Sequence, residues 1–227
     1  MSFTGFPAET QQFFAELNAN NNREWFKAHR LDYDEFVVAP ALSFVEAMIA
    51  PLGLIEPEIV VAPRINGSLR RIYRDTRFSG GKTPFHTHLH LIFWLGAHPL
   101  HSPGFHVVLG ADHARFVAGH WSFSPRELDR YRTAVADEHN ARVLLDIIGA
   151  AEQVGIGASD PPALKEVPAG YDPDCTGATL LRHKGILIKS AENNSAPICG
   201  PSAVSHCEGL VRAALPLVRW LSDTVYR

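Results

Sequence analysis

The side chains best suited to chemistry are concentrated in residues 68–90. Five cationic residues fall within thirteen consecutive positions of this stretch: Arg70, Arg71, Arg74, Arg77 and Lys82. Asp75 is the only acidic residue among them. So much like charge must face a bound anion, carboxylates from elsewhere in the chain, or open water. Residues 68–90 are therefore the first place to expect a site.

The arginine-rich part of this stretch has two interpretations, and both stay open. In the first, cationic side chains line a cleft and bind a small molecule that carries phosphate or carboxylate, because guanidinium groups hold such anions bidentately. The residues expected to line this cleft are Arg71, Arg74, Arg77 and Lys82. Asp75 would then orient the arginines or act as a general base, with Glu24 as a second acid. In the second, the arginines form an internal salt network with carboxylates, as in a non-enzymatic structural or interaction protein.

Three histidines alternate at positions 86, 88 and 90 and therefore share one face of a strand. At a rise of roughly 3.3 Å per residue, neighbours are about 7 Å apart and the outer two about 13 Å apart. Two neighbours can hold one metal ion, and His106 on the following strand is placed to supply a third ligand. The pattern predicts a divalent-metal site of His86, His88 and His106 in a hydrolase or oxygenase. The alternative is a hydrogen-bonded polar face of the sheet.

Composition describes an ordinary globular protein and assigns no reaction. The chain has 227 residues, of which 46% are hydrophobic and 20% charged, with a net charge of −3. This balance gives no reason to expect a nucleic-acid or membrane partner. Its three cysteines show no C-x-x-C spacing, and the N-terminus has no signal-peptide pattern, so we expect a cytoplasmic protein. Motifs for a serine nucleophile elbow or a dinucleotide-binding turn are absent from the sequence.

Hydrophobic periodicity places helices at both ends of the chain and strands between them. Apolar spacing predicts helices over residues 7–19, 32–52, 124–148 and 202–227. Alternating or β-branched runs predict strands over residues 59–65, 68–74, 86–95, 104–110 and 114–120, with a short strand at 186–188. Neighbouring strands with short links form an antiparallel meander. The sequence therefore predicts a single α+β domain over residues 1–227, with a central antiparallel sheet flanked by helices.

Individual residues mark where these elements begin and end. Ser124 and Glu127 form a capping box at a helix start, and Asn22 is expected to cap a short helix. Pro40 is expected to start or kink a helix, Gly53 to end it, and Pro216 to disturb the last helix. Residues 155–176 and 193–201 are expected to be loops.

Several segments resemble a bacterial protein family of about this length whose function is unknown. The family pattern is R-x-x-R-D-x-R-F-x-x-D/N-K-x-x-Y, and the residues that fill it are Arg71, Arg74, Asp75, Arg77, Phe78 and Lys82. Residues 20–26, residues 119–121 and residues 164–172 are similar to the family as well. The resemblance covers essentially the whole chain and implies no particular activity.

This chain departs from the family pattern at two positions of the arginine motif. Gly81 stands where the family has Asp or Asn, and Phe85 stands where it has Tyr. His86 and His90 also lie outside the pattern. Any chemistry that needs the acid or the phenol is therefore not expected in this chain.

Overall fold

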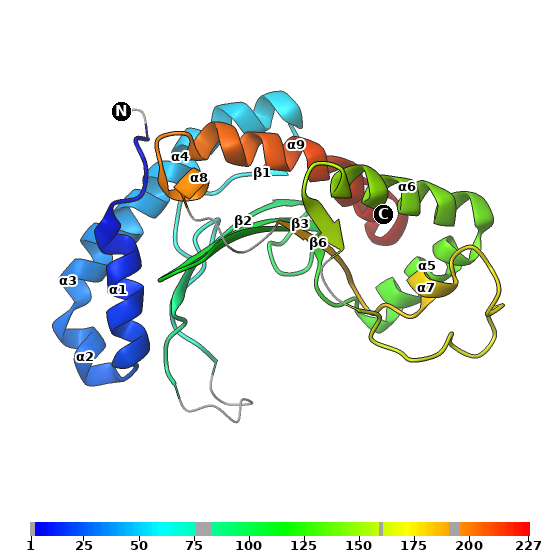
Figure 1. The fold of residues 1–227 in the computed structure, drawn as a ribbon, viewed down its shortest axis with the longest axis horizontal. Coiled ribbons are helices and arrows are strands. Elements are labelled where there is room, and N and C mark those ends of the chain that lie inside the picture. Colours follow the sequence, from blue (N-terminus) through cyan, green and yellow to red (C-terminus); the bar gives the residue numbers. More distant parts are fainter. Residues whose placement is uncertain (1–2, 76–82, 159–160, 191–195) are drawn as a thin grey trace. The chain divides into compact units, whose positions relative to one another are not determined.

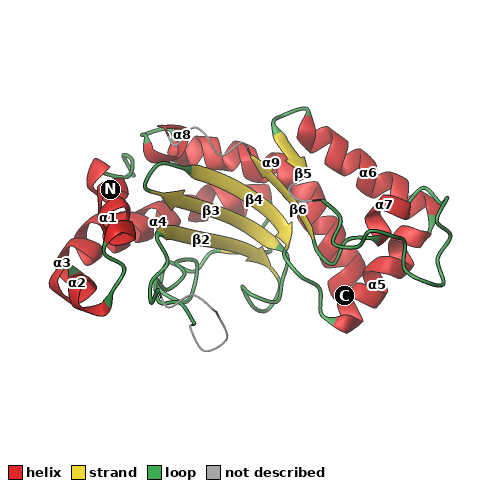
Figure 2. Ribbon diagram, turned by 60° about the horizontal axis from the view of Figure 1, so that its bottom comes forward, coloured by secondary structure: helices red, strands yellow, loops and turns green. Residues whose placement is uncertain are grey.

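The computed structural model describes residues 3–75, 83–158, 161–190 and 196–227, which form an α+β fold with one six-stranded sheet (Figures 1 and 2). The strands are β1 (Ile59–Val60), β2 (His88–Leu95), β3 (Gly104–Gly110), β4 (Ala114–His120), β5 (Ile156–Ala158) and β6 (Ile186–Ser190). The helices are α1 (Ala8–Ala19), α2 (Arg23–Ala28), α3 (Arg30–Tyr33), η1 (Asp34–Val38), α4 (Ala39–Ile55), α5 (Pro125–Ala136), α6 (Glu138–Glu152), α7 (Ala178–Leu181), α8 (Ala196–Cys199), α9 (Ala203–Leu221) and η2 (Ser222–Tyr226). The predicted fold class is confirmed.

Strand order in the sheet is β1-β2-β3-β4-β6-β5, so β2, β3 and β4 form the predicted meander. The bounds of β3 and β4 match the predicted strands residue for residue. β6 pairs antiparallel with both β4 and β5. Short links between consecutive strands favour this antiparallel arrangement.

The chain packs into two compact units, each built from three separate segments. Unit 1 comprises Met1–Phe93, His106–Phe116 and Glu192–Gly209, and unit 2 comprises Trp94–Phe105, Val117–Ala191 and Leu210–Arg227. Strands β2, β3 and β4 each contribute residues to both units. The prediction of a single domain stays a prediction.

Aromatic side chains form much of the core of unit 1. Phe13 of α1 lies at 5.6 Å from Trp25 and from Tyr33, and at 6.4 Å from Phe26, measured between ring centroids. The side chain of Asn22 accepts a 2.9 Å hydrogen bond from the backbone N–H of Trp25, which confirms the predicted cap of α2. These contacts hold α1 against α2 and α3.

Proline shapes the long helical stretch of unit 1 without ending it. Pro40 lies in the first turn of α4 and has no N–H to donate to the carbonyl of Phe36, four residues earlier. The hydroxyl of Thr10 donates to that carbonyl at 2.5 Å. The chain just before α4 is the π-helix η1, so Pro40 marks a change of helix type. The predicted stop at Gly53 is wrong, because α4 continues to Ile55.

The buried face of α4 belongs to the core of unit 1. Phe44, Val45, Met48 and Leu52 have no exposed surface. Among the described segments, Arg30–Ile55 is one helical stretch long and apolar enough to cross a membrane by length and composition, with 28% of its most apolar window buried.

The part of the chain after β4 confirms the predicted helix start and corrects several other expectations. The capping box of Ser124 and Glu127 is present at α5. The stretch after residue 155 contains the short strand β5, and residues 196–199 form α8, although both regions were expected to be loops. Helix α9 continues through Pro216 to Leu221. Segments of three or four residues carry too little periodicity to be recognised from the sequence.

A glycine allows β4 and β6 to approach closely within unit 2. Gly119 has a φ of +122°, and a Cβ at this position would lie 2.1 Å from the carbonyl oxygen of Ile186. We therefore expect Gly119→Ala to lower the free energy of unfolding by at least about 2 kcal/mol, through backbone strain and a backbone clash. Urea denaturation followed by circular dichroism measures this change.

Gly149 provides the matched control for that substitution. It lies inside α6, and a Cβ there would meet no atom within 4 Å. Gly149→Ala should raise the free energy of unfolding by about 0.5–1 kcal/mol, because alanine has the higher helix propensity. Equal effects of the two substitutions would contradict the close approach at Gly119.

Candidate functional site

The arginine-rich segment is held against β2 and the residues just before it. Two isolated antiparallel bridges, Leu69 with Leu91 and Tyr73 with Phe85, fix the pairing. Backbone hydrogen bonds of 2.8–2.9 Å connect the same segments: Arg70 N to His90 O, His86 N to Ile72 O, Arg74 N to Pro84 O, and Ile92 N to Ser68 O. This pairing places the arginines beside the histidines, which follow them in the sequence.

The arginine-rich segment alternates over residues 70–74 as predicted, with Arg71 and Tyr73 more exposed than Arg70, Ile72 and Arg74. The alternation does not extend back to Leu69, which is 1% exposed although it lies three positions before the buried Ile72. The pairing with the opposite chain is irregular: the segment advances two residues from Arg70 to Ile72 while the opposite chain advances four from His86 to His90. The two extra residues lie in the opposite chain.

The histidines form a continuous row of rings in unit 1, which we call the histidine row: His86, His88, His90 and His106. Successive ring centroids are 5.4 Å apart from His86 to His88, 6.4 Å from His88 to His90, and 5.2 Å from His90 to His106. Nε2 of His90 and Nδ1 of His106 are 2.9 Å apart and share a hydrogen bond. All four side chains are partly buried. The row is a connected polar surface rather than a set of isolated side chains.

The structure pairs His106 with His90, whereas the predicted metal site combined His106 with His86 and His88. The hydrogen bond between His90 and His106 engages one ring nitrogen of each residue. Within the described ranges, three or more His, Cys, Asp or Glu side chains nowhere gather in a group that could hold a metal ion. A metal at the histidine row would need the rings to rearrange, so that site stays a prediction.

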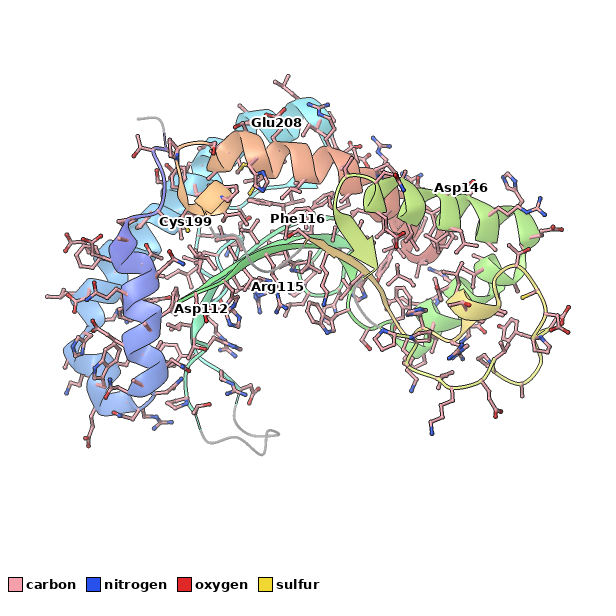
Figure 3. All side chains as sticks on the ribbon, in the orientation of Figure 1. Asp112, Arg115, Phe116, Asp146, Cys199 and Glu208 are labelled. Carbon is pink, nitrogen blue, oxygen red and sulfur yellow. The ribbon has the colours of Figure 1, made fainter. Side chains whose placement is uncertain are left out.

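Burial and neighbouring residues lower the pKa of three members of the histidine row, His86, His88 and His90. Burial is the main cause of a pKa for His88 of about 4, and the nearby His86, His113 and Arg115 lower that pKa further. Burial also holds the pKa of His90 well below its ordinary value. Figure 3 shows Arg115 and the next residue, Phe116, pointing to opposite faces of β4.

The arginines act on the same histidines. Burial lowers the pKa of His86, and Arg74, Arg70 and Arg71 lower it further. Burial likewise lowers the pKa of Arg70, with Arg71 as the second cause. The permanently charged residues that shift the pKa of His86, His88, His90 or Arg70 are all arginines. The local electrostatic field is therefore positive.

A pocket of about 370 Å³ opens beside this positive surface in unit 1. Eight described residues line it: Asn18, Asn21, Arg74, Thr83, Phe85, His86, Thr87 and His88. None of these side chains is acidic, and most can donate hydrogen bonds. We call this the basic pocket.

Hydrogen bonds made by Arg74 and by Asn21 fix the geometry of the basic pocket. Nη1 of Arg74 donates to the hydroxyl of Thr83 at 2.5 Å, which orients the guanidinium group. The amide of Asn21 donates to the carbonyl of Phe85 at 3.0 Å and accepts from its N–H at 3.1 Å. These two hydrogen bonds hold the turn between α1 and α2 against the segment that carries the histidines. The ring of Phe85 stacks on Phe26 at 4.2 Å between centroids, so the floor of the pocket belongs to the core.

The structure brings together some of the predicted site residues and separates others. Arg74, His86 and His88 line the basic pocket. Arg71 is exposed and acts on the pocket through its charge. Asp75 and Glu24 are exposed and are not among the described lining residues, so the acid–base roles predicted for them have no support from this placement. Arg77 and Lys82 lie outside the described residues.

Sequence reasoning missed the polar residues that complete the basic pocket. Asn18 lies in the last turn of α1 and Asn21 in the turn that follows, a stretch that we had interpreted only as a helix boundary and cap. Thr83 and Thr87 flank Phe85 and His86 and showed no pattern of their own. A run of asparagines next to a charged family-like segment is a signal that could have indicated the first pair.

The sequence matches the model of one protein family over nearly its whole length. A family model described as "Conserved hypothetical protein (DUF2461)" matches residues 9–220, which is nearly the whole chain. The chain belongs to this family, as the arginine motif and the other family-like segments had indicated. No curated protein and no solved structure matches the chain.

The depressed pKa of His88 makes the stability of the protein depend on pH. Because the unfolded chain binds a proton near the ordinary value of 6.5 and the folded chain only near 4, stability is lost as the pH falls through that window. At roughly 1.4 kcal/mol per pKa unit, full protonation corresponds to about 3 kcal/mol. We expect His88→Gln to lose less stability than wild type between pH 6.5 and pH 4 in urea denaturation.

His139 serves as the control for this measurement, because it lies exposed on α6. Between pH 6.5 and pH 4, the free energy of unfolding of His139→Gln should fall by as much as that of wild type. If His88→Gln and wild type lose the same stability over this range, His88 is not held neutral by its surroundings.

Proposed function

We propose that this protein binds a small molecule carrying a phosphate or carboxylate group in the basic pocket. The observation that carries the proposal is that the described lining of this pocket holds an arginine and no acidic side chain. Arg74 and two half-buried histidines line it, and none of its eight described lining residues is acidic. A concave site that combines an arginine with neutral hydrogen-bond donors, and whose described lining has no carboxylate, is favourable for an anion.

The lining residues supply the hydrogen bonds that such an anion needs. The guanidinium group of Arg74 gives charge-assisted N–H donors, and Thr83 orients it. The imidazoles of His86 and His88 and the side chains of Asn18 and Thr87 add neutral donors. A volume of about 370 Å³ falls within the range of small-molecule sites and suits a compact metabolite.

Cationic groups outside the pocket extend the positive field. Arg70 and Arg71 lower the pKa of His86, and Arg115 lowers that of His88. Such a field raises the local concentration of anions and their rate of association. The proposal stands on the described residues alone and does not need Arg77 or Lys82.

The competing interpretation, an internal salt network, makes a different prediction about Arg74. In a buried network, loss of one partner leaves a buried charge unpaired and costs about 3–5 kcal/mol of stability. In an anion site, Arg74 stays partly accessible to solvent, and the structure shows it donating a hydrogen bond to the neutral Thr83. Arg74→Gln should then change the free energy of unfolding by less than about 1 kcal/mol in the absence of ligand.

Sulfate is the first probe for binding, because its charge does not change between pH 5 and pH 8. We expect sulfate and orthophosphate to raise the melting temperature of the wild-type protein in a concentration-dependent way. Loss of one charge-assisted hydrogen bond is worth about 1.5–3 kcal/mol, so Arg74→Gln should bind sulfate about 10- to 100-fold more weakly. Isothermal titration calorimetry measures the affinities directly.

The pH dependence of sulfate binding gives a second, independent readout. A bound anion favours the protonated imidazoles and raises the depressed pKa values of His86 and His88. Sulfate should therefore bind more tightly as the pH falls from 7 toward 5, and His88→Gln should weaken this dependence.

Exposed Arg126 of α5 is the matched control, since it does not line the pocket. Arg126→Gln should bind sulfate as wild type does. The proposal fails if sulfate, phosphate and a panel of small phosphate esters and carboxylates leave the melting temperatures of wild type and of Arg74→Gln equally unchanged.

A further inference from the structure

Unit 2 contains a second pocket, of about 310 Å³, that is chemically unlike the basic pocket. We call it the apolar pocket. Residues of α6, α7 and β6 and the chain at residues 161–163 line it, together with Trp121 just after β4. Leu145, Ile148 and Leu180 supply much of its wall. An apolar concave site with a few polar groups at its edge is the usual form of a small-molecule site.

Close backbone contact fixes Trp121 at the edge of the apolar pocket. A Cβ on Gly185 would lie 2.2 Å from the carbonyl oxygen of Trp121, so only glycine permits this approach. The backbone N–H of Phe123 donates to the carbonyl of Lys184 at 2.8 Å and holds the same two segments together. The backbone around the indole of Trp121 is thus rigid, yet the residue is 61% exposed.

Hydrogen bonds also anchor the part of the pocket that residues 161–163 form. The backbone N–H of Leu164 donates to the carbonyl of Arg182 at 3.0 Å, and Nε of Arg182 donates to the carbonyl of Leu164 at 2.9 Å. These two bonds tie the chain that carries Pro161 and Ala163 to the end of α7. The pocket is therefore formed before any ligand arrives, which reduces the entropy lost on binding.

Exposed apolar surface and positive charge meet at this pocket. Trp121 and Leu145, which is 40% exposed, are two of the large hydrophobic residues left open to solvent in unit 2. Lys184 and His183 stand among the lining residues, and none of the described lining residues is acidic. Large exposed apolar side chains around a hollow mark a binding site, and the lysine selects a negatively charged group.

We propose that the apolar pocket binds a small aromatic carboxylic acid. The ring system lies against the indole of Trp121 and contacts Leu145 and Ile148, and the carboxylate pairs with Lys184. Aromatic rings stack favourably on an indole, and the long side chain of lysine reaches a carboxylate at the rim. This site is separate from the basic pocket in composition and in the residues that form it.

The test uses 2-naphthoate as the probe and isothermal titration calorimetry on the full chain. Wild type should bind 2-naphthoate more tightly than the neutral isostere 2-naphthamide. Trp121→Ala should weaken 2-naphthoate binding about tenfold or more, because the stacking surface is lost. Lys184→Gln should weaken it about two- to fivefold, as expected for one exposed ion pair, and should abolish the preference over 2-naphthamide.

Two controls make the result specific to this pocket. Lys165→Gln changes an exposed lysine that does not line the pocket and should bind 2-naphthoate as wild type does. Arg74→Gln should also bind it normally, so failure of the anion site in unit 1 is distinguishable from failure here. Circular dichroism of each variant confirms that it is folded.

Three outcomes overturn the proposal. The first is no binding of 2-naphthoate by wild type at millimolar concentration, and the second is equal binding of 2-naphthoate and 2-naphthamide. The third is a wild-type dimer that Trp121→Ala converts to a monomer in light scattering, which would assign the apolar surface to self-association.

Discussion

The antiparallel pairing of the arginine-rich segment with the start of β2 is the constraint on which the candidate site depends. Backbone hydrogen bonds such as Arg70 N to His90 O and Arg74 N to Pro84 O set which side chains meet. With this register, Arg74 reaches the rim of the same pocket as His86 and His88. A shift of one residue would turn the arginines toward the core, where Leu69 and Ile72 now pack.

This arrangement is electrostatically unfavourable for the protonated form of the histidines. Imidazoles that are half-buried beside arginines lose the ability to hold a proton at neutral pH, as the pKa of about 4 for His88 shows. The residues that surround them do not offset this charge, because the described lining of the basic pocket contains amides, hydroxyls and a phenyl ring. Sites of this kind, with perturbed pKa values inside a hollow, coincide with function more often than other surfaces do.

The basic pocket of unit 1 and the apolar pocket of unit 2 differ in the chemistry that they offer. The basic pocket is lined mainly by hydrogen-bond donors, whereas the apolar pocket is lined mainly by aliphatic side chains and an exposed indole. Close backbone contacts and loop hydrogen bonds, as well as helices, form the apolar pocket. Gly185 allows the backbone of Trp121 to approach closely, and Arg182 donates a hydrogen bond to Leu164. Both pockets use residues that the family pattern does not emphasise, such as Asn18 and Leu145.

Local sequence determined the fold class, the bounds of β3 and β4, the caps at Asn22 and Ser124, and the charged stretch that forms the candidate site. These features follow from periodicity and capping, which act within a few residues. Only the tertiary structure decided that His90 rather than His88 meets His106, that Asn21 clamps Phe85, and that Asp75 and Glu24 do not line the pocket. Those outcomes depend on strand register and on contacts between residues as many as 64 positions apart, which no local pattern encodes.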